Sequence, residues 1–410
     1  MLGNSAGGSA SVEKFLEALV EEMSIPESRY EQAEASYHSL GEWLHRPAST
    51  VRQFDPKVYV QGSFRLGTAI RPVSDAEDYD VDTVCELKIN KSQLTQYSLK
   101  QLLGREVQAY HDAKGMTKPV REGRRCWILD YADGAQFHMD ILPALPNGSD
   151  QRALLERAQK DTRWFATAVA ITDKDEPTYF LITSNWPRSN PKGYASWFNE
   201  RMAVALQRRK RLLVESLQKR GVEASIETMP DYRVRTPLQS AVMLLKRHRD
   251  HMFVRDNDIK PISVIISTLA AHAYSQEETI AGALASILAN MHHYVHSDGR
   301  SYQIPNPTDP LENFADRWQK DPRRADAFFL WLKQAREDFG RLARATTVKD
   351  MNEAVSKHVG VGLTDRAVRK FGSPGTGSLL RAVTAAPVAA ASVPSFGNAP
   401  RVPTTPKGFA

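Results

Sequence analysis

A glycine-serine turn followed by two closely spaced aspartates constrains this chain more than any other feature. Residues 58–60 form a β-branched and aromatic run that is typical of a strand, and Gly62 and Ser63 follow it almost directly. A glycine at this point lets the backbone turn into a helix and approach a ligand closely, so we expect the amides and the Ser63 hydroxyl to cradle phosphates. Asp80 and Asp82 stand two residues apart in a second strand-like run. They would therefore point to the same face of that strand.

A third aspartate completes the pattern. Asp140 lies in the middle of the apolar run 137–142, where an unpaired buried acid would be strongly disfavoured. Carboxylates held close together also repel one another unless a cation neutralises them, and Mg²⁺ prefers such hard oxygen ligands. Each motif alone would arise by chance more often than not, but their ordered combination is specific. It predicts two Mg²⁺ ions, roughly 4 Å apart, held by Asp80, Asp82 and Asp140.

The distribution of apolar residues divides the chain into two kinds of structure. Helical spacing in residues 12–45 is followed by short strand-like runs, and from about residue 237 the pattern becomes helical without internal proline. We expect an α/β lobe with a mixed sheet at residues 1–195, a helical lobe at 196–372 and a disordered tail at 373–410. The expected strands are 58–60, 79–87, 126–131 and 137–142, and the expected later helices are 238–253, 262–274, 280–294 and 323–345.

Two segments favour irregular structure for different reasons. The run 304–310, rich in proline and asparagine, interrupts the helical part and is predicted to form an ordered loop between flanking aromatic residues. The final stretch, 373–410, contains six prolines and no acidic residue. It has few large apolar side chains to offset its ordering entropy, so we expect it to be disordered.

Composition indicates the surroundings and the partners of the protein. Cys85 and Cys126 occur in apolar strand-like runs and not at metal-ligand spacing, which favours a reducing cytoplasm. No run approaches the roughly 20 apolar residues of a membrane helix, so no membrane association is expected. The net charge of +6 favours a polyanionic partner, either nucleic acid or a nucleoside triphosphate.

Three groups of charged or titratable residues are interpreted as structural. The basic run 208–211 is expected to be the solvated face of an amphipathic helix, in preference to a nucleic-acid groove. The acidic residues of 75–78 are expected to form a solvated loop. A third group is expected to make only solvent or local hydrogen-bond contacts, because no cysteine or carboxylate pattern accompanies it. It consists of His248, His251, His292, His293 and His296.

The motif residues together resemble the CD-NTase family, bacterial synthases of cyclic oligonucleotides similar to animal cyclic GMP-AMP synthase and oligoadenylate synthase. The likeness rests on the run 61–68 with Asp80, Asp82 and Asp140, and it extends over residues 12 to about 370. Within the family the chain looks most similar to clades C and D. The resemblance implies a DNA-polymerase-β-like nucleotidyltransferase lobe packed on a helical, oligoadenylate-synthase-like lobe. It also implies that ATP, and often GTP, is joined into a cyclic product that activates antiphage defence (CBASS).

The resemblance also suggests residues that contact nucleotide. Gln61, Gly62 and Ser63 would grip phosphates, while Lys246 and Ser263 would contact the triphosphate of the donor nucleotide. Lys246 could instead be a surface lysine in a basic run, and Ser263 could be a helix-start serine. For the product, the clade resemblance alone implies an adenosine-containing cyclic trinucleotide.

Two other functions and one further partner stay open at this point. A template-independent enzyme that makes linear oligoadenylate or extends RNA ends would use the same acids, although no RNA-binding module is evident. A catalytically silent scaffold of the same fold is disfavoured by the intact carboxylates. The tail ending at Ala410 could be conjugated or bound by a regulatory protein, or it could be idle. Nothing in the sequence requires a nucleic-acid activator.

Overall fold

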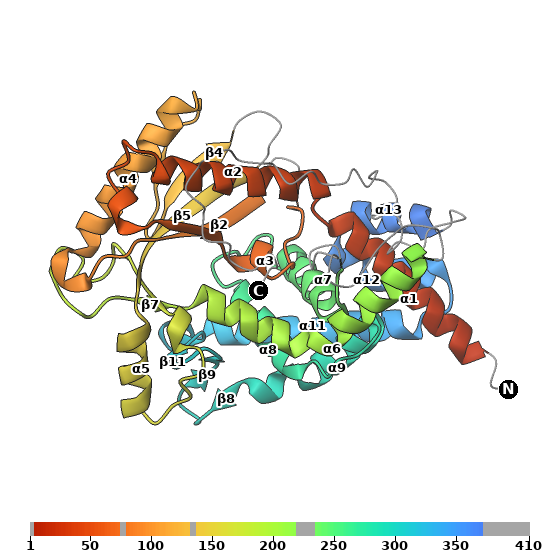
Figure 1. Cartoon of the computed structure of the whole chain (residues 1–410). Coiled ribbons are helices and arrows are strands. Elements are labelled where there is room, and N and C mark those ends of the chain that lie inside the picture. Colours follow the sequence, from red (N-terminus) through yellow and green to blue (C-terminus); the bar gives the residue numbers. More distant parts are fainter. Residues whose placement is uncertain (1–3, 74–78, 132–136, 219–233, 372–410) are drawn as a thin grey trace. The chain divides into compact units, whose positions relative to one another are not determined.

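The computed structural model describes residues 4–73, 79–131, 137–218 and 234–371 (Figure 1). The chain divides into two compact units. The sheet unit consists of residues 25–197 and 305–313. The helical unit consists of the described residues of 1–24, 198–304 and 314–410. The expected lobe boundary near residue 195 therefore differs from the compact units in two segments, the N-terminal helix and the short run 305–313.

The sheet unit is built on a mixed sheet. Its strands run in the order β1-β2-β5-β4-β3, with β6 paired to β5 and β7 paired to β6. The neighbours β2 and β5 are parallel, whereas the other pairs are antiparallel. The strands are β1 (Lys57–Val60), β2 (Tyr79–Glu86), β3 (Arg121–Glu122), β4 (Trp127–Tyr131), β5 (Phe137–Pro146), β6 (Val169–Ile171) and β7 (Arg188–Ser189). The helices of this unit are α2 (Glu27–His45), α3 (Gly62–Arg65), α4 (Gln96–Ala113) and α5 (Gly148–Arg157).

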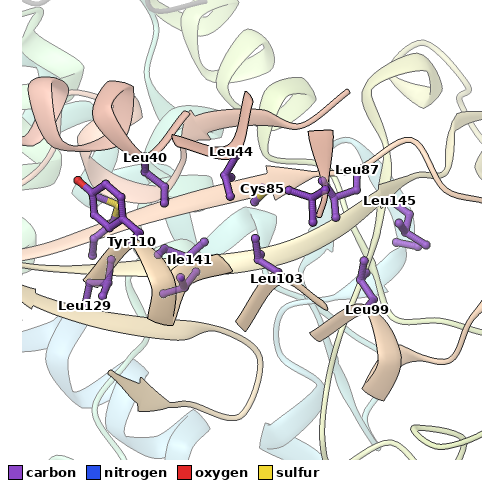
Figure 2. Close-up of a cluster of buried hydrophobic side chains, with 14 of the residues drawn as sticks. Leu40, Leu44, Cys85, Leu87, Leu99, Leu103, Tyr110, Leu129, Ile141 and Leu145 are labelled. Atoms are coloured by element: carbon purple, nitrogen blue, oxygen red, sulfur yellow. The ribbon is translucent and has the colours of Figure 1, made fainter. Parts of the chain in front are cut away.

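The two faces of this sheet differ because side chains alternate along each strand. One face buries Cys85 of β2 and Ile141 of β5 against leucines of α2 and α4, which form the main core of the unit (Figure 2). The opposite face carries a smaller apolar cluster that includes Val84 and Leu142. Residues separated by an even number of positions on one strand point to the same face. Asp80 and Asp82 therefore share the face of Val84, and Asp140 shares the face of Leu142, away from the main core.

The run 305–313 forms a hairpin and not the loop that was expected. It contains β10 (Pro305–Asn306) and β11 (Asp309–Asn313), which pair antiparallel. Asn306 shapes the turn by accepting the Thr308 backbone N–H at 2.9 Å, as an Asx turn does. The buried carboxylate of Asp309 accepts from Nε of Arg188 at 2.9 Å, which anchors the hairpin to β7. Residues 305–313 therefore belong to the sheet unit, although most of the helical sequence precedes them.

The helical unit has most of its helices near the predicted positions. Its elements are α1 (Asn4–Met23), most of α6 (Pro191–Gln218), α7 (Pro237–Met252), α8 (Ser263–Ala273), α9 (Ile280–Asn290), β8 (His296–Ser297), β9 (Tyr302–Gln303), α10 (Asp316–Lys320), α11 (Arg323–Arg344), α12 (Val348–Val359) and α13 (Val361–Phe371). Local chemistry defines the start of α7, where Thr236 accepts the Gln239 N–H in a capping box and Pro237 occupies the first turn. Among the described residues no helix is long and apolar enough to span a membrane.

The N-terminal helix α1 belongs to the helical unit because its contacts lie there. Glu22 near the end of α1 accepts from Arg366 of α13 at 2.8 Å and also pairs with Lys370 at 2.6 Å. Leu16 and Leu19 of α1 are almost fully buried. The sequence pattern showed a helix here but not which sheet or helices it packs against.

The basic run and the histidines differ in part from their expected roles. In the basic run, Arg208 and Arg211 are exposed but Lys210 is buried, so the face of α6 is solvated only in part.

The interpretation that His248 lacks a carboxylate partner is wrong, since its Nε2 lies 3.0 Å from Oδ2 of Asp338. Asp338 stands far along the chain on α11, so spacing could not reveal the pair. The acidic loop 75–78 and the tail 373–410 lie outside the described residues.

Candidate active site

The pairing of β2 with β5 brings the three predicted acids together. The two strands are parallel, and their register places Asp82 beside Asp140 and Asp80 beside His138. Neighbouring residues in register on parallel strands point to the same side of a sheet. The sequence predicted each strand and each acid, and the register that makes Asp82 and Asp140 direct neighbours comes from the structure.

Gly62 is required here by a contact with one of these acids. It begins α3 with φ of +62°, and a Cβ built on it would overlap Oδ2 of Asp82. The preceding residue, Gln61, donates its backbone N–H to the carbonyl of Asp82 at 2.8 Å. The turn and the carboxylate are thus fitted to each other, and any side chain at residue 62 would displace Asp82. Ser63 follows, half-buried, with its carbonyl accepting from Thr68 N–H at 2.9 Å.

Asp140 is a carboxylate whose hydrogen bonding is incomplete. Its Oδ1 is inaccessible to solvent and has no hydrogen-bond partner among the described residues. Its Oδ2 accepts only a weak hydrogen bond from the Cys126 thiol at 3.4 Å. Burial, and secondly the charge of Asp80, raise the pKa of Asp140 above its usual value. A buried oxygen of this kind is costly unless a cation or donor reaches it.

Two neighbours of the acids were not predicted as part of the site. His138 Nε2 lies 3.4 Å from Oδ1 of Asp80 and 4.0 Å from Oδ1 of Asp140. The hydrogen bond with Asp80 raises the pKa of His138. At Cys126, directly before the neighbouring strand β4, burial and secondly the charge of Asp140 raise the pKa of the thiol to about 12, so the thiol stays protonated. Period-two spacing from Asp140 was the one sequence signal that could have indicated His138.

The arrangement fits a bound cation. Asp80, His138 and Asp140 each offer one ligand atom, and these atoms all lie within 4.8 Å of one another. Asp82 is adjacent to Asp140 in the strand register. A divalent ion would satisfy the buried Oδ1 of Asp140, which has no hydrogen-bond partner among the described residues.

Lys246 and Ser263, the other predicted contacts, lie in the helical unit. Lys246 is 6% exposed on α7, so the interpretation as a solvated surface lysine is wrong. Ser263 is the first residue of α8, and its Oγ lies 3.0 Å from Nη1 of Arg249, which also donates to the Pro261 carbonyl. Their contact with triphosphate stays a prediction.

Comparison with known proteins relates this geometry to a kind of enzyme. Residues 56–143 match a family model described as Cyclic GMP-AMP synthase DncV-like, nucleotidyltransferase domain. That range contains Gly62 and the three acids. A "c-di-GMP synthase" of Roseivirga ehrenbergii is 24% identical over 84% of this chain and 83% of its own. The "Cyclic dinucleotide synthase CdnG" of Bradyrhizobium diazoefficiens is also 24% identical, over 87% of this chain and 83% of its own.

Solved structures show the same fold. The Bradyrhizobium diazoefficiens CdnG structure, in complex with GTP, aligns with a TM-score of 0.66 at 20% identity, covering 88% of this chain and 99% of that one. The Escherichia coli CdnC:HORMA complex aligns with a TM-score of 0.55 at 14% identity, covering 85% and 96%. The expected fold class, a mixed-sheet nucleotidyltransferase lobe with a helical lobe, is therefore confirmed. With three carboxylates on one face of that sheet, the chain is a nucleotidyltransferase with a DncV-like fold.

Proposed function

We propose that this nucleotidyltransferase joins nucleoside triphosphates into a cyclic oligonucleotide second messenger for antiphage signalling. Two Mg²⁺ ions, when bound, would lower the pKa of the attacking ribose hydroxyl and neutralise the triphosphate and leaving pyrophosphate. Asp80 and Asp82 would hold both ions, and Asp140 would complete the site nearer the attacking hydroxyl. Gln61, Gly62 and Ser63 would contact the phosphates.

The observation that carries this proposal is the junction of Gly62, Asp82 and Asp140. A scaffold with no chemistry would gain stability by pairing the buried Oδ1 of Asp140 or by replacing the acid with an apolar residue. It would also have no need of a glycine held at φ of +62° against a carboxylate. Both features are explained if substrate and metal complete the site.

The product is the least constrained part of the proposal. The two similar synthases, from Roseivirga and Bradyrhizobium, are both named for a cyclic dinucleotide, which favours a product of that size. The CdnG structure was solved in complex with GTP, so GTP is the first substrate to test. The adenosine-containing cyclic trinucleotide expected from clade resemblance stays a prediction, as does the clade itself. We therefore propose GTP, ATP or both as substrates and a ring of two nucleotides as the first product to seek.

The experiment is incubation of the purified protein with Mg²⁺ and labelled nucleoside triphosphates, singly and in all combinations. Phosphatase treatment and mass spectrometry of the products follow. A phosphatase-resistant product of two nucleotides supports the proposal, and the Asp82→Asn variant run in parallel should give none. A ladder of phosphatase-sensitive oligomers would support linear oligoadenylate or RNA-end synthesis. Absence of pyrophosphate release with every combination would support the silent scaffold.

A protein partner acting on the C-terminal tail remains part of the proposal. One distant structural neighbour was solved with a HORMA protein, which shows that a protein partner occurs on this fold. The tail of this chain, ending at Ala410, could be bound by such a regulator or be conjugated. Removing residues 400–410 should leave nucleotidyl transfer by the purified protein nearly unchanged but abolish any partner-dependent attachment. Loss of activity by the truncated protein alone would refute this role for the tail.

A further inference from the structure

A second cluster of potential ligand atoms lies in the helical unit, outside the proposed active site. It joins three helices through His248 of α7, Asp338 of α11 and His358 of α12. Oδ2 of Asp338 lies 3.0 Å from Nε2 of His248 and 2.6 Å from Nδ1 of His358. The side chains of His248 and Asp338 are 0% and 1% exposed, whereas that of His358 is 12% exposed. Two imidazole nitrogens and one carboxylate oxygen therefore converge on one buried point.

The spacing of these atoms suits a first-row divalent metal. All three ligand atoms lie within 4.8 Å of one another. Around tetrahedral Zn²⁺, nitrogen and oxygen ligands about 2.0–2.1 Å from the ion lie about 3.3 Å from each other. Distances of 3.0 and 2.6 Å to Asp338 Oδ2 are slightly shorter. Small side-chain rotations would therefore open the cluster enough for an ion, without displacement of the helices.

The surroundings orient the carboxylate as ligand-supporting groups do in metal sites. The other oxygen of Asp338, Oδ1, accepts from Nε2 of Gln334 at 2.9 Å and from Nη2 of Arg341 at 2.6 Å. Oδ2 is thereby left to face the two histidines. The ring of His248 is held between aromatic neighbours, with centroids 5.7 Å from Phe339 and 6.5 Å from Trp331.

Without an ion, both histidines direct an N–H to the same carboxylate oxygen of Asp338. With an ion, each imidazole would instead offer the lone pair of that nitrogen, and its proton would move to the other ring nitrogen. A metal uses the converging lone pairs directly, and the partial exposure of His358 leaves a side from which an ion and a water ligand can enter.

We propose that His248, Asp338 and His358 bind Zn²⁺ or a similar first-row divalent ion, with water as a fourth ligand, and that this ion clamps α7, α11 and α12 together. Imidazole nitrogen with a carboxylate suits Zn²⁺, in contrast to the all-oxygen ligands that Mg²⁺ prefers. The role is structural, and it does not depend on the reaction proposed above.

The test uses the full chain carrying Asp140→Asn, so that the acids beside His138 do not compete for the ion. After treatment with a chelator and dialysis, the protein is titrated with Zn²⁺ against a chromophoric chelator. In parallel it is loaded with Co²⁺ and examined by visible absorption. One tightly bound Zn²⁺ per chain and the absorption bands of four-coordinate Co²⁺ are expected. A protein that binds neither ion at a stoichiometric level would overturn the proposal without any further variant.

The ligand assignment is tested by substitution of the most exposed member. His358→Gln should weaken Zn²⁺ binding by roughly 100-fold or more, since loss of a supporting residue already costs 10- to 100-fold. It should also remove the Zn²⁺-dependent rise in melting temperature. His251→Gln is the matched control, because His251 lies on α7 against Gly360 and is outside the ligand set. Equal Zn²⁺ affinity of the two variants would show that the ion binds elsewhere and would overturn the assignment.

Discussion

Two carboxylates of the sheet unit, Asp140 and Asp173, differ in how far neighbouring side chains compensate their negative charge. Asp173 is fully buried, and both of its oxygens accept from arginine: Oδ1 from Nε of Arg124 at 2.5 Å, and Oδ2 from Nε of Arg125 at 2.7 Å. Nη2 of Arg124 adds a second bond to Oδ2 at 2.6 Å. Asp140, in contrast, has no protein cation within hydrogen-bond distance among the described residues, and one of its oxygens is buried without a hydrogen-bond partner.

The difference indicates that Asp173 has a structural role, whereas Asp140 is placed to bind a ligand. Burial acts to raise the pKa of Asp173, but the hydrogen bonds from both arginines outweigh it and hold the pKa below its usual value. Burial and the charge of Asp80 raise the pKa of Asp140. Asp173 therefore stabilises the fold as an anion, whereas Asp140 costs stability as an anion until a cation arrives. If that division holds, substitution of Asp140 should mainly impair catalysis and substitution of Asp173 should mainly impair stability.

The largest effect on activity should come from substitution of Asp140. Asp140→Asn removes a charge that we assign to metal binding, so kcat for pyrophosphate release should fall by about a thousandfold or more, equivalent to about 4 kcal/mol. Initial rates with saturating Mg²⁺ and nucleoside triphosphate measure this. Asp80→Asn and Asp82→Asn should behave similarly, and a variant retaining a tenth of the activity would contradict the metal assignment.

Gly62→Ala should lower the catalytic activity far more than the same substitution at Gly115. The added methyl would press on Oδ2 of Asp82, and a misplacement of about 1 Å at a reacting centre can cost roughly 100-fold in rate. Gly115→Ala is a matched control, because Gly115 also has φ of +62° but has nothing within 4 Å of its added Cβ. Both variants share the strain of a side chain at positive φ, and similar activities would mean that the contact with Asp82 is unimportant.

Asp173→Asn should destabilise the fold without the specific catalytic role of Asp140. We expect a loss of ~2–3 kcal/mol in unfolding free energy, less than for a fully buried pair because Arg124 and Arg125 are 43% and 50% exposed. Urea unfolding of the two proteins measures it. Asp175→Asn is the control, since Asp175 is exposed and pairs with Arg124 only at the surface. Equal destabilisation by both variants would refute the structural role of Asp173.

The contribution of Asp173 should also depend on pH with a definite sign. Its folded-state pKa lies below the unfolded value of about 3.9, so its stabilisation is complete well above that pH and is lost as pH falls through the folded-state pKa. The difference in unfolding free energy between wild type and Asp173→Asn should therefore be large at neutral pH and shrink below about pH 4. A difference that grows on acidification would show that the carboxylate is not the stabilising form.

The smallest effect should be a gain in stability from Asp140→Asn without Mg²⁺. Removing a buried, incompletely bonded charge should raise the melting temperature by about 2 °C, corresponding to a stability gain of under about 1 kcal/mol. Adding Mg²⁺ should stabilise the wild type more than the variant. If Asp140→Asn melts below wild type in the absence of Mg²⁺, the acid is structural and the contrast with Asp173 fails.

Local chemistry alone determined much of this protein. The β-branched runs, capping residues and proline-free apolar patterns were enough to predict strands 58–60 and 79–87 and helices 238–253 and 323–345 nearly as observed. The pairing of Asp80 with Asp82 on one strand face follows from period-two geometry, and a mid-strand acid among apolar neighbours already implied a partner for Asp140. Such features are encoded within a few residues, so they can be read without the fold.

Other features depend on contacts between distant segments, and only the tertiary structure decided them. The parallel register sets Asp82 beside Asp140, and the turn before α3 explains Gly62 by contact with Asp82 and not only by phosphate binding. The hairpin 305–313 joins the sheet unit through Asp309, although helical sequence surrounds it. His248 meets Asp338 across 90 residues of chain. Strand register and helix packing are set by the summed burial and hydrogen bonding of many residues, so no short motif specifies them.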